Sequence, residues 1–298
     1  MTAPTITPSD RVAPGSIRQL AHIEAARSLR RISIWAGAAL TVVILAGETT
    51  ADWSGGSYIE KLPQSFMPII LGAFIAALRT GWRDRRHDVS ESAPLDPNDR
   101  AAARLAGMAL PVLLTVVIVI GFAVTSRIEG GFWIGDSPRR TDTALHSIAE
   151  LLQPPLVVAF AVALGVAIGR ARARLSITLA IIAGMALFTM FPGYWLWNIP
   201  PVHAFTPVQT QPLVIDLDAA TSIDQIPADW FVEFDGNQPT TRQLVHQPTI
   251  LGHTLYLVGL TALAAGLALR ASRGRRLAAL GGAVAVVGIV AQLVVSPL

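Results

Sequence analysis

The sequence predicts an all-α polytopic membrane protein of about seven transmembrane helices, with a small β-containing insertion on the extracytoplasmic side. The chain has 298 residues, of which 52% are hydrophobic and 14% are charged, whereas about 25% of the residues of an average soluble domain are charged. Several uncharged apolar runs approach or exceed the ~18 residues that mark a membrane-spanning helix. Arginine supplies nearly all of the positive charge, because Lys61 is the only lysine, and the arginines gather in particular connections.

Seven apolar segments are candidate spans, and each must be helical because backbone polar groups in lipid have to be paired within their own segment. They cover residues 32–49, 64–82, 105–125, 151–169, 175–197, 250–269 and 277–295. The chain then divides into a cytoplasmic tail with an elbow helix, five spans, an extracytoplasmic insertion and two final spans, over residues 1–31, 32–197, 198–249 and 250–298.

The distribution of arginine predicts the orientation, since short cytoplasmic connections are rich in Arg and Lys. Arginine-rich segments precede the first span and follow the second, fourth and sixth, whereas 50–63 and 198–249 contain one basic residue each. This alternation requires that 64–82 crosses, although its apolar part is short. We therefore expect the N-terminus inside, the C-terminus outside and a multi-pass protein of the plasma (inner) membrane.

The predicted elbow helix covers residues 16–31. Ser16 and Gln19 have the spacing of a capping box. Apolar residues then lie near one face of the helix and arginines occupy much of the rest. Such a helix is suited to lie on an anionic inner leaflet, which makes membrane lipid a predicted partner. The alternative is a solvated helical tail.

Residues 141–152 carry an apolar stripe at helical spacing and predict a surface helix that leads into the fourth span. Pro154 and Pro155 are then expected to break or kink the chain.

The insertion 198–249 contains LVIDLD (213–218) and WFVEFD (230–235), which alternate apolar with acidic residues as half-buried strands do. A small acidic β-hairpin or cap is expected there. The acidic residues predict a solvated surface, because no spacing among them matches a calcium-binding loop.

Several kinds of chemistry have no residues to support them. The chain has no cysteine, so it has no disulfide, thiolate metal site or thiol nucleophile. It also has no GxxxxGK[ST], HExxH or GxSxG motif. We expect no catalytic residue, metal or cofactor in this chain and no nucleic-acid partner, with any ATP hydrolysis performed by a separate subunit.

A candidate polar cluster lies at the expected outer face. Glu48 ends the first span, His146 and Glu150 are one helical turn apart before the fourth, and His253 opens the sixth. These side chains are candidates for a metal, proton or substrate site. The favoured interpretation is that interfacial positions tolerate polar groups, with His253 bonding a neighbouring helix. Water is then expected to replace a lost partner of either histidine.

The longest cytoplasmic connection, 79–104, carries charges of both signs and is a candidate ATPase-coupling loop. Its candidate residues are Arg83, Asp84, Arg85, Arg86, Asp96 and Asp99. Asp96 followed by Pro97, with Asp99 in the first turn, predicts a helix start. A docking surface for a protein is expected to have this mixture of charges, and a solvated linker is the alternative.

The layout of elbow helix, paired spans, charged inner connection and outer insertion precedes the stretch LGHTLYLVGLTALAAGLALRASRGRR (251–276). This arrangement resembles ABC-2-type transporter permeases of high-GC Gram-positive (actinobacterial) bacteria, in which a start like His253, Tyr256 and Leu257 opens a Gly/Ala/Leu helix that ends in arginines. At the level of residues the resemblance covers about 251–295, and a seventh span departs from the six-helix core of that family.

The resemblance implies a permease subunit that forms homodimers or heterodimers and binds a cytosolic ATP-binding subunit. The complex would export an amphiphile such as a lipid, a peptide or an antibiotic-like compound. Two alternatives remain from the residues alone. One is a non-catalytic membrane subunit or scaffold of a larger complex, and the other is an intramembrane enzyme that uses the outer His/Glu cluster.

Overall fold

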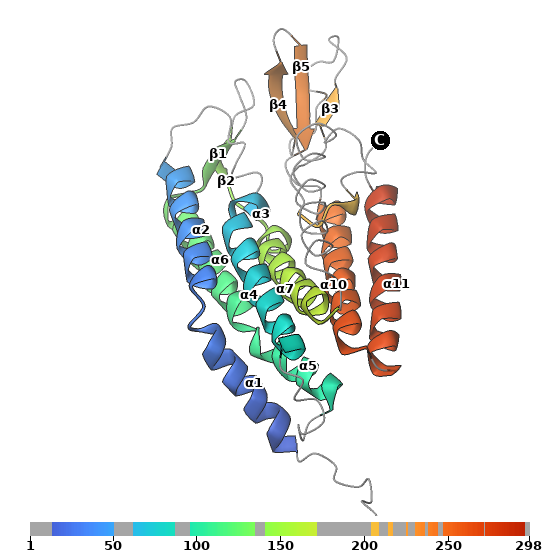
Figure 1. Ribbon diagram of the computed structural model, residues 1–298. Helices are drawn as coiled ribbons and strands as arrows, with labels where there is room; N and C mark the ends of the chain where they lie inside the picture. The colour runs from blue at the N-terminus through green and yellow to red at the C-terminus, as the bar shows by residue number, and fades with distance from the viewer. Residues whose placement is uncertain are drawn as a thin grey trace, which may run out of the picture.

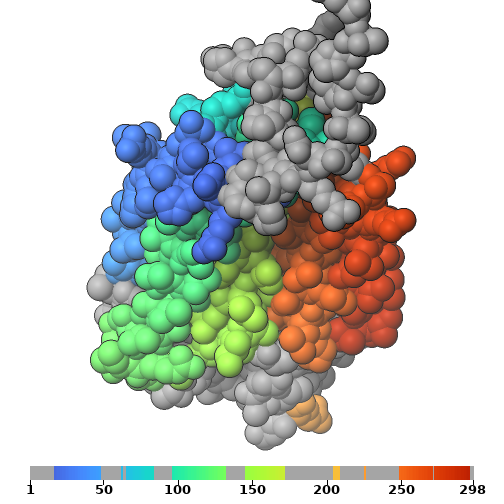
Figure 2. Space-filling view, turned by 90° about the horizontal axis from the view of Figure 1, so that it is seen from below, coloured from blue at the N-terminus to red at the C-terminus, as the bar shows by residue number. Residues whose placement is uncertain are grey.

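The computed structural model describes residues 14–50, 62–86, 96–134, 141–171, 204–208, 214–216, 225, 230–235, 238–243, 247–270 and 272–295. Its helices are α1 (Pro14–Ser28), α2 (Ile32–Thr50), α3 (Leu62–Ser65), α4 (Met67–Arg86), α5 (Pro97–Gly107), α6 (Leu110–Ile128), α7 (Ile148–Arg170), α10 (Gln247–Leu269) and α11 (Ser272–Val295). The long helices run side by side as a bundle, from which α1 extends at the lower end (Figure 1). Seen from that end, α1 and α2 lie on one side and α10 and α11 on the other (Figure 2).

The helices are those of a multi-pass membrane protein. In the described part of the chain, four segments are long and apolar enough to cross a membrane: Pro97–Ile128, Ile148–Arg170, Pro248–Leu269 and Ser272–Val295. Ile17–Ser28 and Ile32–Gly47 meet at 58° and make a fifth if the bent pair counts as one span.

The predicted span 64–82 falls on α3 and α4, and α4 is not among these candidates because charged residues from Arg79 onward occupy its last turns. It lies inside the bundle, where Ile69, Ala73, Ala76 and Ala77 are fully buried. The predicted span 175–197 lies outside the described residues.

Glycines set the spacing between α4 and its neighbours. A Cβ added at Gly72 of α4 would lie 2.1 Å from the backbone oxygen of Ser33 on α2. On the other side of α4, a Cβ at Gly169 of α7 would lie 2.5 Å from the backbone oxygen of Leu78. Because real Cβ atoms do not approach so closely, α2 and α7 can contact α4 at these points only through glycine. Small residues that let backbones meet are the usual solution in membrane bundles.

The two helices of the α10–α11 hairpin also approach closely through glycines. Glycines recur every seven residues along the contact, at Gly252, Gly259 and Gly266 on α10 and at Gly274, Gly281 and Gly288 on α11. A Cβ at Gly281 would lie 2.3 Å from the nitrogen of Leu263, and one at Gly288 would lie 2.4 Å from the nitrogen of Tyr256. The two backbones therefore meet along the hairpin, and Arg270 turns the chain between them with a positive φ of 61°.

The strands are β1 (Phe132–Ile134), β2 (Thr141–Ala144), β3 (Val214–Asp216), β4 (Trp230–Asp235) and β5 (Gln238–Gln243). The two segments in which strands were expected, 213–218 and 230–235, contain β3 and β4. These strands do not pair with each other, because β5 lies between them in an antiparallel sheet of order β3-β5-β4. A separate antiparallel pair joins β1 to β2.

The predicted helix over 141–152 is wrong at its start. Residues 141–144 form β2, whose Ala144 pairs with Phe132 of β1, and α7 begins only at Ile148. A break or a kink was expected at Pro154 and Pro155, and the break is wrong, since α7 continues through both to Arg170. Both prolines are buried in the bundle, where packing against neighbouring helices tolerates their missing amide hydrogen bonds.

Gly281→Ala tests the close contact in the hairpin, and Gly282→Ala is its matched control. The added methyl group at position 281 meets backbone atoms at 2.3 Å, whereas nothing lies within 4 Å of the same group at position 282. We expect Gly281→Ala to lower the free energy of unfolding by about 1–3 kcal/mol, as overpacking does. Gly282→Ala should leave it unchanged or raise it by up to ~1 kcal/mol through helix propensity. Thermal unfolding in one detergent compares them, and equal effects would contradict the close approach.

Candidate functional site

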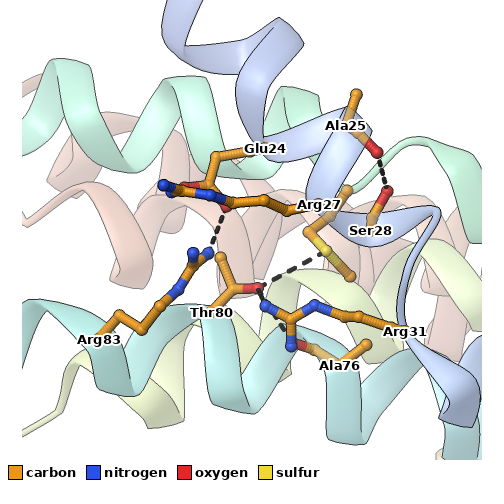
Figure 3. Close-up of polar contacts among 9 residues, drawn as sticks. Glu24, Ala25, Arg27, Ser28, Arg31, Ala76, Thr80 and Arg83 are labelled. Carbon is orange, nitrogen blue, oxygen red and sulfur yellow. Dashed lines mark hydrogen bonds and ion pairs between the residues drawn. The ribbon is translucent and has the colours of Figure 1, made fainter.

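The end of the bundle at which α1 lies is rich in arginine, and this arginine-rich end contains a carboxylate buried among guanidinium groups. Glu24 on α1 is 3% exposed. One of its oxygens accepts a hydrogen bond from Arg27 Nη1 at 2.9 Å, and the other forms an ion pair with Arg83 Nη2 of α4 (Figure 3). Because a buried charge needs a partner of opposite sign, this pair holds α1 against α4.

Arg31 lies in the bend that follows α1 and makes a second link to α4. It donates to the backbone oxygen of Ala76 at 2.7 Å and to Thr80 Oγ1 at 2.8 Å (Figure 3). Burial, and after it the neighbouring charge of Arg83, lowers the pKa of Arg31 from its ordinary value, while Glu24 opposes the shift. At the bend itself, Trp35 Nε1 donates to the oxygen of Leu29 at 2.7 Å and so pairs a carbonyl left by the end of α1.

Helix α5 packs against the same part of α1. A Cβ added at Gly107 of α5 would lie 2.5 Å from Glu24 Cβ and 2.8 Å from the backbone oxygen of Ala21. The elbow is therefore a packed element of the bundle, in contact with α4 and α5. It begins at Pro14, earlier than the predicted start at Ser16.

The start of α5 confirms the predicted helix signal. Asp96 is the N-cap, and its carboxylate accepts from the backbone nitrogen of Asn98 at 2.7 Å, with Pro97 and Asp99 in the first turn. The backbone oxygen of Pro97 accepts from Arg170 Nη2 at 3.0 Å.

Arg170, at the end of α7, joins this point to α10. Its side chain is largely buried and also donates to the backbone oxygen of Ala268. Arg270, in the turn after α10, donates in return to the backbone oxygen of Arg170. One guanidinium thus connects the ends of α5, α7 and α10. The other arginines of the hairpin tip, Arg273, Arg275 and Arg276, are exposed on α11.

The candidate coupling residues fall in three places. The side chain of Arg83 forms an ion pair with Glu24 of α1. Asp84, Arg85 and Arg86 belong to the last turn of α4, and Asp96 and Asp99 begin α5. The expected connection 79–104 is therefore helical at both ends, and only 87–95 lies outside the described residues.

The residues of the outer polar cluster have different partners. His146 Nδ1 lies 3.0 Å from Glu150 Oε1, and the second carboxylate oxygen accepts from the backbone nitrogen of Ser147 at 2.6 Å. Since Ser147 Oγ accepts from the backbone nitrogen of Glu150, these residues form the capping box that starts α7. The ring of His146 also contacts that of Phe122 on α6, with centroids 5.8 Å apart.

His253 lies elsewhere and is fully buried. Its ring nitrogens contact Gln153 Oε1 at 2.6 Å and the backbone oxygen of Thr206 at 2.9 Å. The contact with Gln153 on α7 agrees with the expected bond to a neighbouring helix. The expectation that water can replace its partners is wrong, because a side chain of 0% exposure has no contact with solvent. Sequence reasoning also missed Gln153, for which no periodicity or motif gave a signal. Glu48 belongs to α2, and its side chain lies outside the described residues.

Within the described residues, no group of three or more His, Cys, Asp or Glu side chains could hold a metal ion. No protein-family model matches the chain, and no curated protein or solved structure is significantly similar to it.

Arg170→Ala and Arg170→Lys test the three-helix junction, with exposed Arg273→Ala as the control. Alanine leaves the carbonyls of Pro97 and Ala268 without this donor, so we expect a loss of about 2–4 kcal/mol in unfolding free energy, from two charged hydrogen bonds of about 1.5–3 kcal/mol each with partial compensation. Lysine should recover part of the loss, because one ammonium group cannot span two carbonyls as the planar guanidinium does. Equal unfolding free energies for Arg170→Ala and Arg273→Ala would contradict the role of Arg170 as a junction of three helices.

Proposed function

We propose that this chain is the transmembrane subunit of an ATP-driven exporter of an amphiphile, with hydrolysis performed by a separate cytosolic subunit. The proposed topology has seven spans, with the N-terminus and the arginine-rich end in the cytoplasm and the sheet of β3, β4 and β5 outside. The bent pair of α1 and α2, the four candidate spans and the apolar run 175–197 support six of these spans, and α4, over the predicted span 64–82, is the seventh in this proposal. The resemblance of residues 251–295 supports the amphiphile class, the dimer of permeases and the plasma membrane.

The observation that carries the proposal is the position of α5. This short helix of 11 residues begins at an exposed N-cap at the arginine-rich end. Its first residue is tied through Arg170 to the ends of α7 and α10. Its last residue packs on α1 beside Glu24, which is paired with α4.

A partner that displaces the exposed start of α5 would therefore act on four other helices at once. Packed cores respond to such a displacement by moving between discrete arrangements rather than by deforming continuously. An element with these connections fits the role of receiving work from an ATPase.

Replacing 88–95 by a Gly/Ser segment of equal length tests the docking role. This replacement leaves the last turn of α4 and the Asp96 cap in place, so insertion and folding should be normal. We expect the tagged full-length chain, purified from its native host, to lose a co-purifying ATPase. The control is Arg275→Gln, which changes an exposed charge on the hairpin and should retain the ATPase.

Retention of the ATPase by the 88–95 replacement would remove docking from this segment while leaving the exporter proposal intact. A parent chain that purifies without any ATPase would contradict the exporter proposal itself. Stoichiometric purification with several other membrane chains instead would favour a scaffold subunit.

A further inference from the structure

A short segment enters the bundle between helices that are distant in sequence. Residues 204–208 lie near the end of α10 and α11 that is opposite α1 (Figure 1). Ala204, Thr206 and Val208 are buried, whereas Phe205 is 47% exposed. Val208 packs against Val157 of α7 and Leu257 of α10, and side chains of α4 border the same cluster.

Three consecutive backbone oxygens of this segment accept hydrogen bonds from buried side chains. Tyr256 Oη donates to the oxygen of Phe205 at 2.7 Å, and His253 Nε2 lies 2.9 Å from the oxygen of Thr206. Gln292 Nε2 of α11 donates to the oxygen of Ala204 over a longer 3.4 Å. Two of these donors come from successive turns of α10, and all three side chains are buried.

Each of these contacts supplies a hydrogen-bond donor to a backbone carbonyl of the segment. Ala204 and Phe205 are the last residues of a helical turn, and Thr206 follows it. Carbonyls at the end of a helix lack an intrahelical donor, so when they are buried they must find another. Here the helices supply the donors from their side chains, so the position of 204–208 depends on a few polar contacts as well as on apolar packing. A segment held in this way can be released by breaking those contacts, without unwinding any of the long helices.

The same network also joins α7 to α10. Gln153 of α7 contacts His253 Nδ1 and donates its Nε2 to Thr254 Oγ1 at 2.7 Å. His253 is therefore the residue that connects the segment with the interface of the two helices. At the other end, Gln292 Oε1 is buried with no hydrogen-bond partner among the described residues, so Ala204 is the more weakly held end.

We propose that residues 204–208 are a releasable strap that closes the bundle at the end opposite α1, between α4, α7, α10 and α11. His253 and Tyr256 are its positioning residues, because they hold consecutive carbonyls. If the chain is an exporter, release of the strap would open the packing between these helices at this end. The strap itself can be tested whether or not the chain transports anything.

The absence of native cysteine makes a thiol reporter simple. In Val208→Cys the reporter is 5% exposed while the strap is closed, and in Phe205→Cys it is exposed throughout. We measure the rate of maleimide labelling of the full-length protein in lipid nanodiscs. In the parent background, Val208→Cys should label much more slowly than Phe205→Cys. Where closing outpaces labelling, the rate is proportional to the open population.

Adding Tyr256→Phe removes only the hydroxyl that binds the oxygen of Phe205. It should raise the labelling rate of Val208→Cys about five-fold, which is the factor for one typical net hydrogen bond. At position 253, asparagine places an amide near the original Nδ1 and loses the strap contact, whereas glutamine reaches the position of Nε2 and can keep it. We therefore expect His253→Asn to act like Tyr256→Phe and His253→Gln to stay close to the parent.

Ala73→Cys reports on the integrity of the bundle, because this α4 position is fully buried in the main core. It should remain unlabelled in every variant. Parallel labelling of Ala73→Cys would overturn the inference, since the whole bundle would then be opening. So would equal rates for Val208→Cys and Phe205→Cys in the parent, or no acceleration by Tyr256→Phe and His253→Asn.

Discussion

The buried carboxylate of Glu24 is the interaction on which the arrangement of the arginine-rich end depends. A charge with 3% exposure is stable only beside opposite charge, and the guanidinium that supplies it from another helix belongs to Arg83 of α4. That contact fixes where α1 lies before the 58° bend. Once α1 is fixed, Gly107 allows α5 to approach the same turn, and the three helices form one packed unit.

At both ends of the bundle, backbone carbonyls accept hydrogen bonds from side chains, and the kind of side chain differs between the ends. At the arginine-rich end, Arg170 gives its hydrogen bonds to carbonyls at the ends of α5 and α10. At the opposite end, His253 and Tyr256 give theirs to the strap. Between these ends the contacts are mostly apolar and glycine lets the backbones approach, with a few side-chain hydrogen bonds such as that from Ser33 Oγ to the backbone oxygen of Gly72.

Much of the helical layout could be predicted from the sequence, because long apolar runs and local caps are properties of neighbouring residues. The cap at Asp96 is an example, since its carboxylate binds a nitrogen only two residues away. The errors concern which segments pair with one another, which the residue pattern within one segment does not indicate. Strand β2 exists because 141–144 pair with β1, and the place of β5 between β3 and β4 depends on the register of the whole sheet.

The candidate residues show the same division. Arg83 was predicted as a residue of a docking surface, and its ion pair with Glu24 was not predicted, because Glu24 is 59 residues away. His253 was expected to bond a neighbouring helix near water, but neither its burial nor its partners on α7 and on the strap could be identified from the sequence. The pairing of His146 with Glu150 could be predicted, because these residues are one turn apart. No local sequence pattern indicates that a residue has a buried partner on another helix.

The central claim is that Glu24 and Arg83 hold α1 on the bundle, and a double-mutant cycle with Glu24→Gln and Arg83→Gln measures it most directly. Unfolding free energies of the parent, both single variants and the double variant give the coupling between the two side chains. We predict a favourable coupling of about 1–3 kcal/mol, the range for directly contacting charged residues. A parallel cycle of Glu24 with exposed Arg79, one turn earlier on α4, should give much less. A coupling near zero between Glu24 and Arg83, or one no larger than that with Arg79, would contradict the account.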